Sequence, residues 1–95
     1  MILSFRCKDT EALFNGRNIA RFANIRSTVE RKLQMLDSAT TLDFLRSPPG
    51  NRLEALVGDR TGQHSIRIND QYRICFAWND QGPIGPTNVE IVDYH

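Results

Sequence analysis

The fold is decided by the stretch HSIRINDQYRICFAW, residues 64–78, which alternates apolar and polar side chains on both sides of a short turn. Alternation with a period of two is typical of half-buried β-strands, so the stretch predicts a hairpin with strands His64–Ile68 and Tyr72–Trp78. The register must keep the apolar residues of both strands on the buried face. This requirement sets Ile66 opposite Ile74 and leaves the residues between the two strands as the loop.

The same register places Arg67 directly opposite Arg73 on the face away from the core. Like charges that face each other across a strand pair are destabilising. Three arrangements would relieve the repulsion: a nearby carboxylate, an anionic ligand, or two side chains that splay apart into water. The ligand interpretation indicates a phosphate site, because the guanidinium fork fits two phosphate oxygens at once.

Flanking segments predict the rest of the sheet. A short alternating run over Arg52–Leu56 predicts one strand, and Gly58–Gly62 predicts the turn that follows it. After the hairpin, the Gly- and Pro-rich segment Asp80–Pro86 predicts a loop. The apolar run that follows predicts a last strand over Asn88–His95.

Helical signals occupy the first half of the chain. Met1–Phe5 alternates weakly and predicts an opening strand. Asp9 is a suitable N-cap for a short helix over Thr10–Phe14, and Gly16 is placed to end that helix in a left-handed turn.

A longer helix follows, because apolar residues recur at spacings of three and four. Thr40 or Thr41 caps a third short turn before Pro48-Pro49-Gly50 blocks further helix. Helices followed by an antiparallel meander predict one α+β domain over residues 1–95, with a small antiparallel sheet and two to three N-terminal helices packed on one face. The apolar stripe of the longer helix consists of Phe22, Ile25, Val29, Leu33 and Leu36.

Composition places the chain among ordinary globular domains. It has 95 residues, of which 40% are hydrophobic and 24% are charged. No apolar run approaches the length of a membrane span, so we expect a cytoplasmic protein without membrane contact. Residues 1–32 carry seven Lys or Arg against three acids, and residues 76–95 carry three acids and no base. The basic half indicates either a polyanion-binding surface or a solvated helix surface.

Three successive residues near the end of the sequence, Asp93-Tyr94-His95, carry a carboxylate, a phenol and an imidazole. These are side chains commonly used in general acid–base catalysis. A frayed strand end is the alternative interpretation. Arg60, beside two glycines, is a candidate phosphate ligand or a solvated turn residue. Glu54 is a candidate general base or an ion-pair partner of a nearby arginine.

Three segments together resemble the HigB toxins of bacterial type II toxin–antitoxin modules, within the RelE/ParE superfamily. They are RLEALVGDRTG at 52–62, SIRINDQYRICF at 65–76 and VEIVDYH at 89–95. The resemblance implies a microbial-ribonuclease-like fold. It also implies an endoribonuclease that cleaves messenger RNA in the A site of the 70S ribosome. The implied partner is a HigA-like helix-turn-helix antitoxin, through which alone the toxin would reach operator DNA.

The resemblance also implies a site. The family's phosphate-binding arginines fall on Arg60, Arg67 and Arg73, and its C-terminal catalytic group falls on Asp93, Tyr94 and His95. Neither a metal ion nor a cofactor is implied. Glu54 and Val57 stand where members of the family present a histidine and a lysine, so the identity of the general base differs from the family pattern.

These assignments form a mechanistic hypothesis in which the 2′-hydroxyl attacks the adjacent phosphorus. The arginines stabilise the phosphate charge, with Arg73 central. His95 is the leading proton-transfer group, because an imidazole titrates near neutral pH. Asp93 acts as base or tunes His95, Tyr94 stacks or donates a proton, and Glu54 is a second candidate base. The alternatives are a ParE-like gyrase inhibitor and a weakly catalytic toxin that acts mainly within an autorepressor complex.

Overall fold

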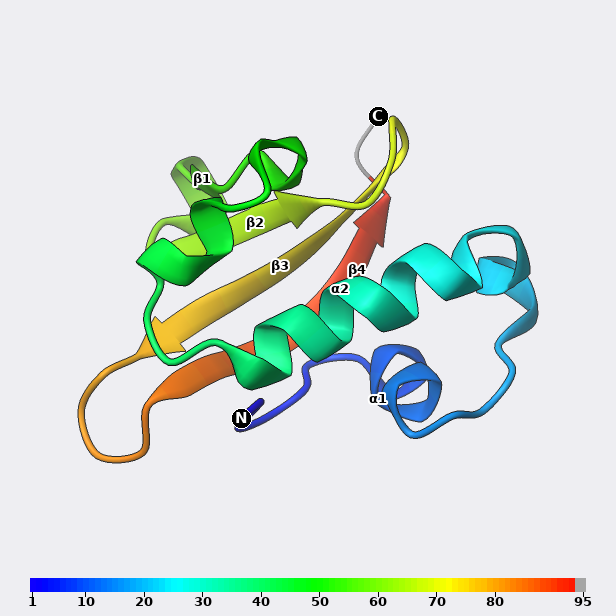
Figure 1. The fold of residues 1–95 in the computed structure, drawn as a ribbon, viewed down its shortest axis with the longest axis horizontal. Helices are drawn as coiled ribbons and strands as arrows, with labels where there is room; N and C mark the ends of the chain where they lie inside the picture. The colour runs from blue at the N-terminus through cyan, green and yellow to red at the C-terminus, as the bar shows by residue number, and fades with distance from the viewer. Residues whose placement is uncertain (94–95) are drawn as a thin grey trace.

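A computed structural model describes residues 1–93, which form a four-stranded antiparallel sheet with helices on one side (Figure 1). The strands follow one another in the order β1-β2-β3-β4. The predicted α+β class, with its helices before its sheet, is confirmed. The elements are α1 Lys8–Phe14, η1 Ala20–Ile25, α2 Arg26–Ser38, η2 Asp43–Arg46, η3 Pro49–Asn51, β1 Glu54–Ala55, η4 Gly58–Arg60, β2 Gln63–Arg67, β3 Tyr72–Asn79 and β4 Gly85–Asp93, where η marks a 3₁₀ turn.

The predicted register of the central hairpin is confirmed. Ile66 lies opposite Ile74, and Arg67 lies opposite Arg73. The turn between the strands is closed by Asn69, whose side-chain oxygen accepts hydrogen bonds of 2.8 Å from two backbone N–H groups of the turn. An Asn that bonds to the backbone two residues ahead is a standard way to hold a tight turn.

The core lies between α2 and the sheet, and α2 runs across one sheet face in Figure 1. The stripe on α2 packs against the alternate residues of β2, β3 and β4 that point to the same side. Burying one such aliphatic or aromatic side chain contributes roughly 1.5–3 kcal/mol. No helix within residues 1–93 is long and apolar enough to cross a membrane. The large apolar residues that are at most 1% exposed are Leu13, Phe22, Val29, Leu33, Leu36, Leu45, Ile66, Ile74, Phe76 and Val89.

The expected long helix is divided in two. Phe22 and Ile25 belong to the 3₁₀ turn η1, and the α-helix begins at Arg26. The backbone of Ile25, with ψ of 5°, departs from helical geometry between them. Residues three apart share a face in a 3₁₀ turn as they do in an α-helix, so spacing alone did not reveal the division.

The predictions for the first residues need correction. Met1–Phe5 forms no strand and makes a single parallel bridge, between Phe5 and Val89. The segment donates to β4 through Leu3 N–H, 2.8 Å from the carbonyl oxygen of Pro86. Pro86 has no N–H to return, which interrupts a regular ladder at this point. Gly85 is required beside it, because a Cβ there would collide with the carbonyl oxygen of Met1.

The first helix starts before its predicted cap. Helix α1 begins at Lys8, with Cys7 at the N-cap and no side-chain capping bond. Asp9 instead lies in the first turn, where its carboxylate is 3.2 Å from Nε of Arg21. An acidic residue in the first turn still interacts favourably with the helix dipole. The left-handed backbone predicted at Gly16 is confirmed by its φ of 89°.

Strands β2 and β3 lie within one residue of their predicted bounds, whereas β1 and β4 differ by two residues or more at their first residue. Strand β1 covers only Glu54–Ala55, because Arg52 adopts a left-handed backbone with φ of 46° that no strand accommodates. Strand β4 begins at Gly85, three residues earlier than expected, since Asn79 pairs with Gly85 and Trp78 pairs with Pro86.

A buried polar contact joins α2 to the segment that leads into the sheet. Lys32 is 8% exposed and its ammonium donates to Oδ1 of Asn51, which is fully buried. The Asn51 amide nitrogen donates in turn to the carbonyl oxygens of Leu45 and Ser47, at 3.1 and 3.4 Å. Burial lowers the pKa of Lys32, and the neighbouring charges of Arg31 and Arg67 lower it further. The ammonium therefore depends on its acceptor.

We predict that Asn51→Ala lowers the free energy of unfolding by about 2–3 kcal/mol, because it leaves a buried ammonium without its acceptor. Urea denaturation followed by circular dichroism measures the change. Asp43→Asn is the control, since it removes an ion pair with Arg46 whose side chains are 84% and 73% exposed. Its expected effect is within about 0.5 kcal/mol. Equal losses in the two variants would contradict a structural role for the buried contact.

Candidate active site on the outward face

We call the sheet face opposite α2 the outward face. Residues paired across a ladder point to the same side of a sheet, so the register identifies its members. One row across the strands consists of Glu54, Ser65, Cys75 and Glu90, and the next consists of Arg67, Arg73 and Val92.

Arg73 is anchored at the centre of this face. Its side chain is 10% exposed, and Nε donates to Oγ of Ser65 at 2.7 Å. Nη2 donates to the carbonyl oxygen of Arg52 at 2.6 Å and lies 3.6 Å from Oε1 of Glu54. The guanidinium thereby links β3 to β2 and to the start of β1. Glu54 was considered an ion-pair partner of a nearby arginine, and the structure places it beside Arg73.

Arg67 has a separate acidic partner. Its guanidinium pairs with Asp70, three residues on in the hairpin turn. The Asp70 side chain is fully exposed and that of Arg67 is 32% exposed, so the pair is worth little in stability. Of the three arrangements considered for the facing arginines, the nearby carboxylate is the one observed, with a different carboxylate for each.

Arg60 reaches the outward face from the turn η4. Nη1 is 2.8 Å from Oε1 of Glu90 and donates to Oε1 of Gln63 at 3.1 Å. Glu90 is also 3.7 Å, through Oε2, from Nε of Arg6 in the N-terminal segment. The Glu90 side chain is only 15% exposed, so this carboxylate is held among cations away from bulk water.

Cys75 is fully buried and pairs with Ser65 on one neighbouring strand and with Glu90 on the other. Arg73 is bonded to that serine and Arg60 to that glutamate. Burial raises the pKa of the Cys75 thiol, Arg60 and Arg73 act to lower it, and Glu90 acts to raise it. The two guanidinium groups are therefore bonded to the residues on either side of Cys75 in one row of the sheet. The protonated thiol is a poor nucleophile, whereas the two guanidinium groups form a concentrated positive site.

The C-terminal candidates are only partly described. Asp93 is the last described residue; Tyr94 and His95 lie outside the described residues. The register sets Asp93 opposite Tyr72, whose ring packs edge-on against Phe22 on the helix side of the sheet. Asp93 therefore does not belong to the outward rows. Its carboxylate accepts a hydrogen bond of 3.1 Å from Nε2 of Gln71.

His64 lies on the opposite side of the sheet from the arginines. Its ring centroid is 6.0 Å from that of Phe76, and burial lowers the pKa of the imidazole, which is therefore neutral at pH 7. Glu54 is half exposed on β1 beside Arg73. Val57 is 85% exposed just before η4. Within residues 1–93 no three His, Cys, Asp or Glu side chains gather as a metal site would require.

Sequence reasoning missed Glu90, Arg6 and Ser65. Glu90 was detectable, because it is the polar position between buried Val89 and Ile91, and the alternation used for the hairpin extends to this strand. The contribution of Arg6 depends on a contact between the first residues and β4, for which the local sequence carries no signal.

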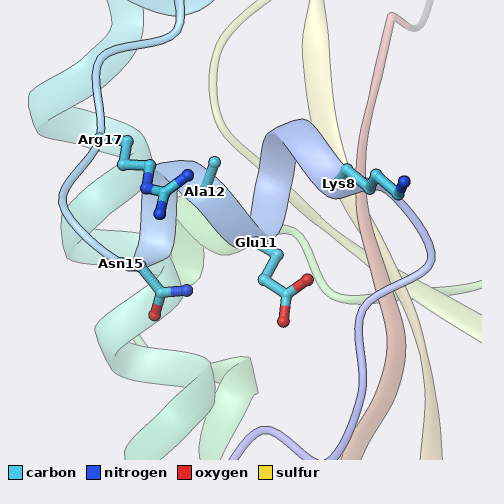
Figure 2. Close-up of a pocket in the computed structure, with 5 residues that line it drawn as sticks. All are labelled: Lys8, Glu11, Ala12, Asn15 and Arg17. Carbon is cyan, nitrogen blue, oxygen red and sulfur yellow. The ribbon is translucent and has the colours of Figure 1, made fainter.

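A hollow of about 320 Å³ lies elsewhere, along α1. Figure 2 shows Lys8 and Arg17 toward its two ends, with Glu11 and Asn15 between them. Its lining mixes both signs of charge, and α1 belongs to the helical layer. The hollow is therefore separate from the arginine site.

Comparison with known proteins identifies the family of this chain. Residues 4–95 match the family described as the RelE-like toxin of type II toxin–antitoxin system HigB. Toxin HigB-1 of Vibrio cholerae serotype O1 is 42% identical over 82 residues, covering 84% of this chain and 86% of that protein. An uncharacterised protein of Haemophilus influenzae is 36% identical over 58 residues, covering 61% of this chain and 57% of that protein.

A solved structure, that of a YoeB/ParE toxin from Agrobacterium tumefaciens, aligns over 99% of this chain and 97% of its own, with 19% identity and a TM-score of 0.47. The family match spans nearly the whole sequence, including every residue of the outward face. The chain belongs to the HigB family of RelE-like toxins from type II toxin–antitoxin systems.

Proposed function

We propose that this toxin is an endoribonuclease that cleaves messenger RNA in the A site of the 70S ribosome and thereby inhibits translation and growth. The observation that carries the proposal is that Arg73 and Arg60 are bonded to the two residues on either side of Cys75 in one row of the outward face, Ser65 and Glu90. Two guanidinium groups held along one row of a sheet suit the charge that develops on a phosphate during cleavage.

The proposed phosphate ligands are Arg60, Arg67 and Arg73. They differ in how firmly they are held, since Arg73 has hydrogen bonds to buried Ser65 whereas Arg67 pairs with an exposed carboxylate. A charge fixed before the substrate arrives need not reorganise during the reaction, which is the main source of electrostatic catalysis. Arg73 and Arg60 therefore carry the transition-state charge, and Arg67 contacts a flanking phosphate.

The proposed proton transfers use His95 as the leading group, with Asp93 tuning it and Tyr94 stacking on a base or donating a proton. Glu54 is the second candidate base, because its carboxylate lies beside Arg73 on the outward face and is half exposed. Attack by the 2′-hydroxyl would leave a 2′,3′-cyclic phosphate and a 5′-hydroxyl, without a metal ion.

Dependence on the ribosome is supported by the balance of charge on the outward face. Its arginines are interspersed with Glu54, Asp70 and Glu90, and the whole chain carries a formal net charge of only +1. Affinity for free RNA comes largely from uncompensated cations. A toxin with so few is expected to rely on the ribosome to hold its substrate.

Membership of a toxin–antitoxin family implies an antitoxin as partner. We propose a HigA-like helix-turn-helix protein, which would contact operator DNA on behalf of the complex. The basic helical layer, away from the outward face, is the proposed docking surface. We further propose that residues 1–95 act as a single toxin domain in the cytoplasm.

We predict that Arg60→Ala lowers the rate of mRNA cleavage on translating ribosomes by about 10²–10³-fold, the usual effect of removing one preset donor to the transition state. Primer extension on ribosome-bound mRNA measures the rate. Arg46→Ala is the matched control, because this arginine is 73% exposed on η2 in the helical half. We expect it to keep the wild-type rate.

The same mRNA without ribosomes tests ribosome dependence and should be cut poorly. Efficient cutting of free RNA would contradict the proposed dependence. Growth arrest that persists in Arg60→Ala, with antitoxin binding unchanged, would contradict the nuclease proposal. Loss of gyrase supercoiling activity in the same cells would then indicate a gyrase inhibitor.

We predict that His95→Ala lowers the cleavage rate by about 10²–10⁴-fold, because proton transfer to or from the reacting oxygens would be lost. His64→Gln is the matched control, since it removes the other imidazole of the chain from the helix side of the sheet. A single 2′-deoxy nucleotide at the scissile position should block cleavage. Cleavage of that substrate, or a wild-type rate in His95→Ala, would contradict the mechanism.

A further inference from the structure

Glu90 is the most enclosed carboxylate of the outward face. Its side chain is 15% exposed, whereas that of Glu54 is 55% exposed and that of Asp70 is fully exposed. Removing an ionised carboxylate from water is costly unless cations or hydrogen bonds compensate it. Two arginines do so here, Arg60 through one carboxylate oxygen and Arg6 through the other.

The packing of the turn that carries Arg60 does little to fix its position. η4 contains no buried residue, and its backbone is closed by local bonds such as that from Thr61 N–H to the carbonyl oxygen of Gly58, at 3.1 Å. Within residues 1–93, the Arg60 guanidinium is bonded to Glu90 and Gln63, both on the sheet. These contacts are therefore well placed to set its direction.

We propose that Glu90 is a positioning residue that fixes the direction of the Arg60 guanidinium on the outward face before RNA arrives, and that Arg6 is bound into the same cluster through the other oxygen of the carboxylate. The proposal rests on the proposed ribonuclease function. Glu90 itself does not touch the reacting atoms. Its negative charge offsets some of the positive charge that would attract RNA, and its carboxylate fixes the direction of Arg60. Misplacement of a catalytic group by about 1 Å can cost 10²-fold in rate.

The proposal predicts that loss of the Glu90 charge lowers the rate of cleavage without weakening binding to the ribosome and its mRNA. Glu90→Gln keeps the size of the side chain and one acceptor oxygen but removes the charge. We expect the maximal rate of single-turnover cleavage on ribosomes to fall about tenfold or more. The toxin concentration that gives half of this rate should not rise, because the variant has one negative charge fewer beside the RNA.

Two further variants identify Arg60 as the route of the effect. In an Arg60→Ala background, Glu90→Gln should cause no further loss, because residues that act as a unit are not additive. Asp70→Asn is the charge-matched control, since it also removes a carboxylate that pairs with an arginine of this face, but at a fully exposed position. A tenfold loss in Asp70→Asn, or additive losses in the double variant, would overturn the proposal.

A spectroscopic measurement needs no activity. The Nη–Hη signals of a guanidinium resolve in ¹⁵N–¹H spectra when bonding slows rotation about its C–N bonds. The signals lost in Arg60→Lys identify Arg60, and we expect them to broaden or shift in Glu90→Gln. If that variant does not fold, Glu90→Asp, which keeps the charge on a shorter side chain, should show the same change and the same loss of rate.

Unchanged Arg60 signals in a folded Glu90 variant would overturn the proposal, even if wild-type toxin proved to cut no RNA. Changed signals together with an inactive wild type would instead support the positioning of Arg60 and contradict the nuclease function. The two failures are therefore distinguishable.

Discussion

The alignment of Ile66 with Ile74 across β2 and β3 is the constraint on which the rest of the structure depends. It turns the isoleucines toward α2 and, because side chains alternate along a strand, turns Arg73 and Cys75 to the other side. A slip of one residue would exchange the two faces and bury arginines in the core. The same burial that stabilises the fold therefore also assembles the outward face.

The outward face concentrates positive charge without leaving it uncompensated. Glu54, Asp70 and Glu90 lie beside Arg73, Arg67 and Arg60 in turn, and the burial of these carboxylates ranges from an enclosed Glu90 to an exposed Asp70. The enclosed contacts can orient a guanidinium, whereas the exposed one contributes little beyond screening. Such a face suits the proposed substrate, an mRNA that the ribosome already holds in place.

The features that depend on the local alternation of apolar and polar residues could be predicted from the sequence. The features that depend on contacts between distant segments could not. The hairpin register and the position of its loop were predicted correctly, because the alternation that sets them is local. The opening strand was wrong because Pro86, in a segment far along the chain, cannot return a hydrogen bond to it. Strand β1 is short because Arg52 has a left-handed backbone, which an arginine side chain does not predict. Glu90 was detectable as a polar position of the last strand, but its pairing with Arg60 and Arg6 joins segments far apart in the sequence and emerged only from the folded chain.

The most direct test of the proposed role of the outward face is a structure of the toxin on a 70S ribosome. Its mRNA should carry a 2′-O-methyl group at the scissile nucleotide, which blocks attack by that oxygen. We predict that Arg60 and Arg73 contact the scissile phosphate while α2 faces away from the mRNA. An mRNA lying against the helical layer, with the outward face turned from it, would contradict that role.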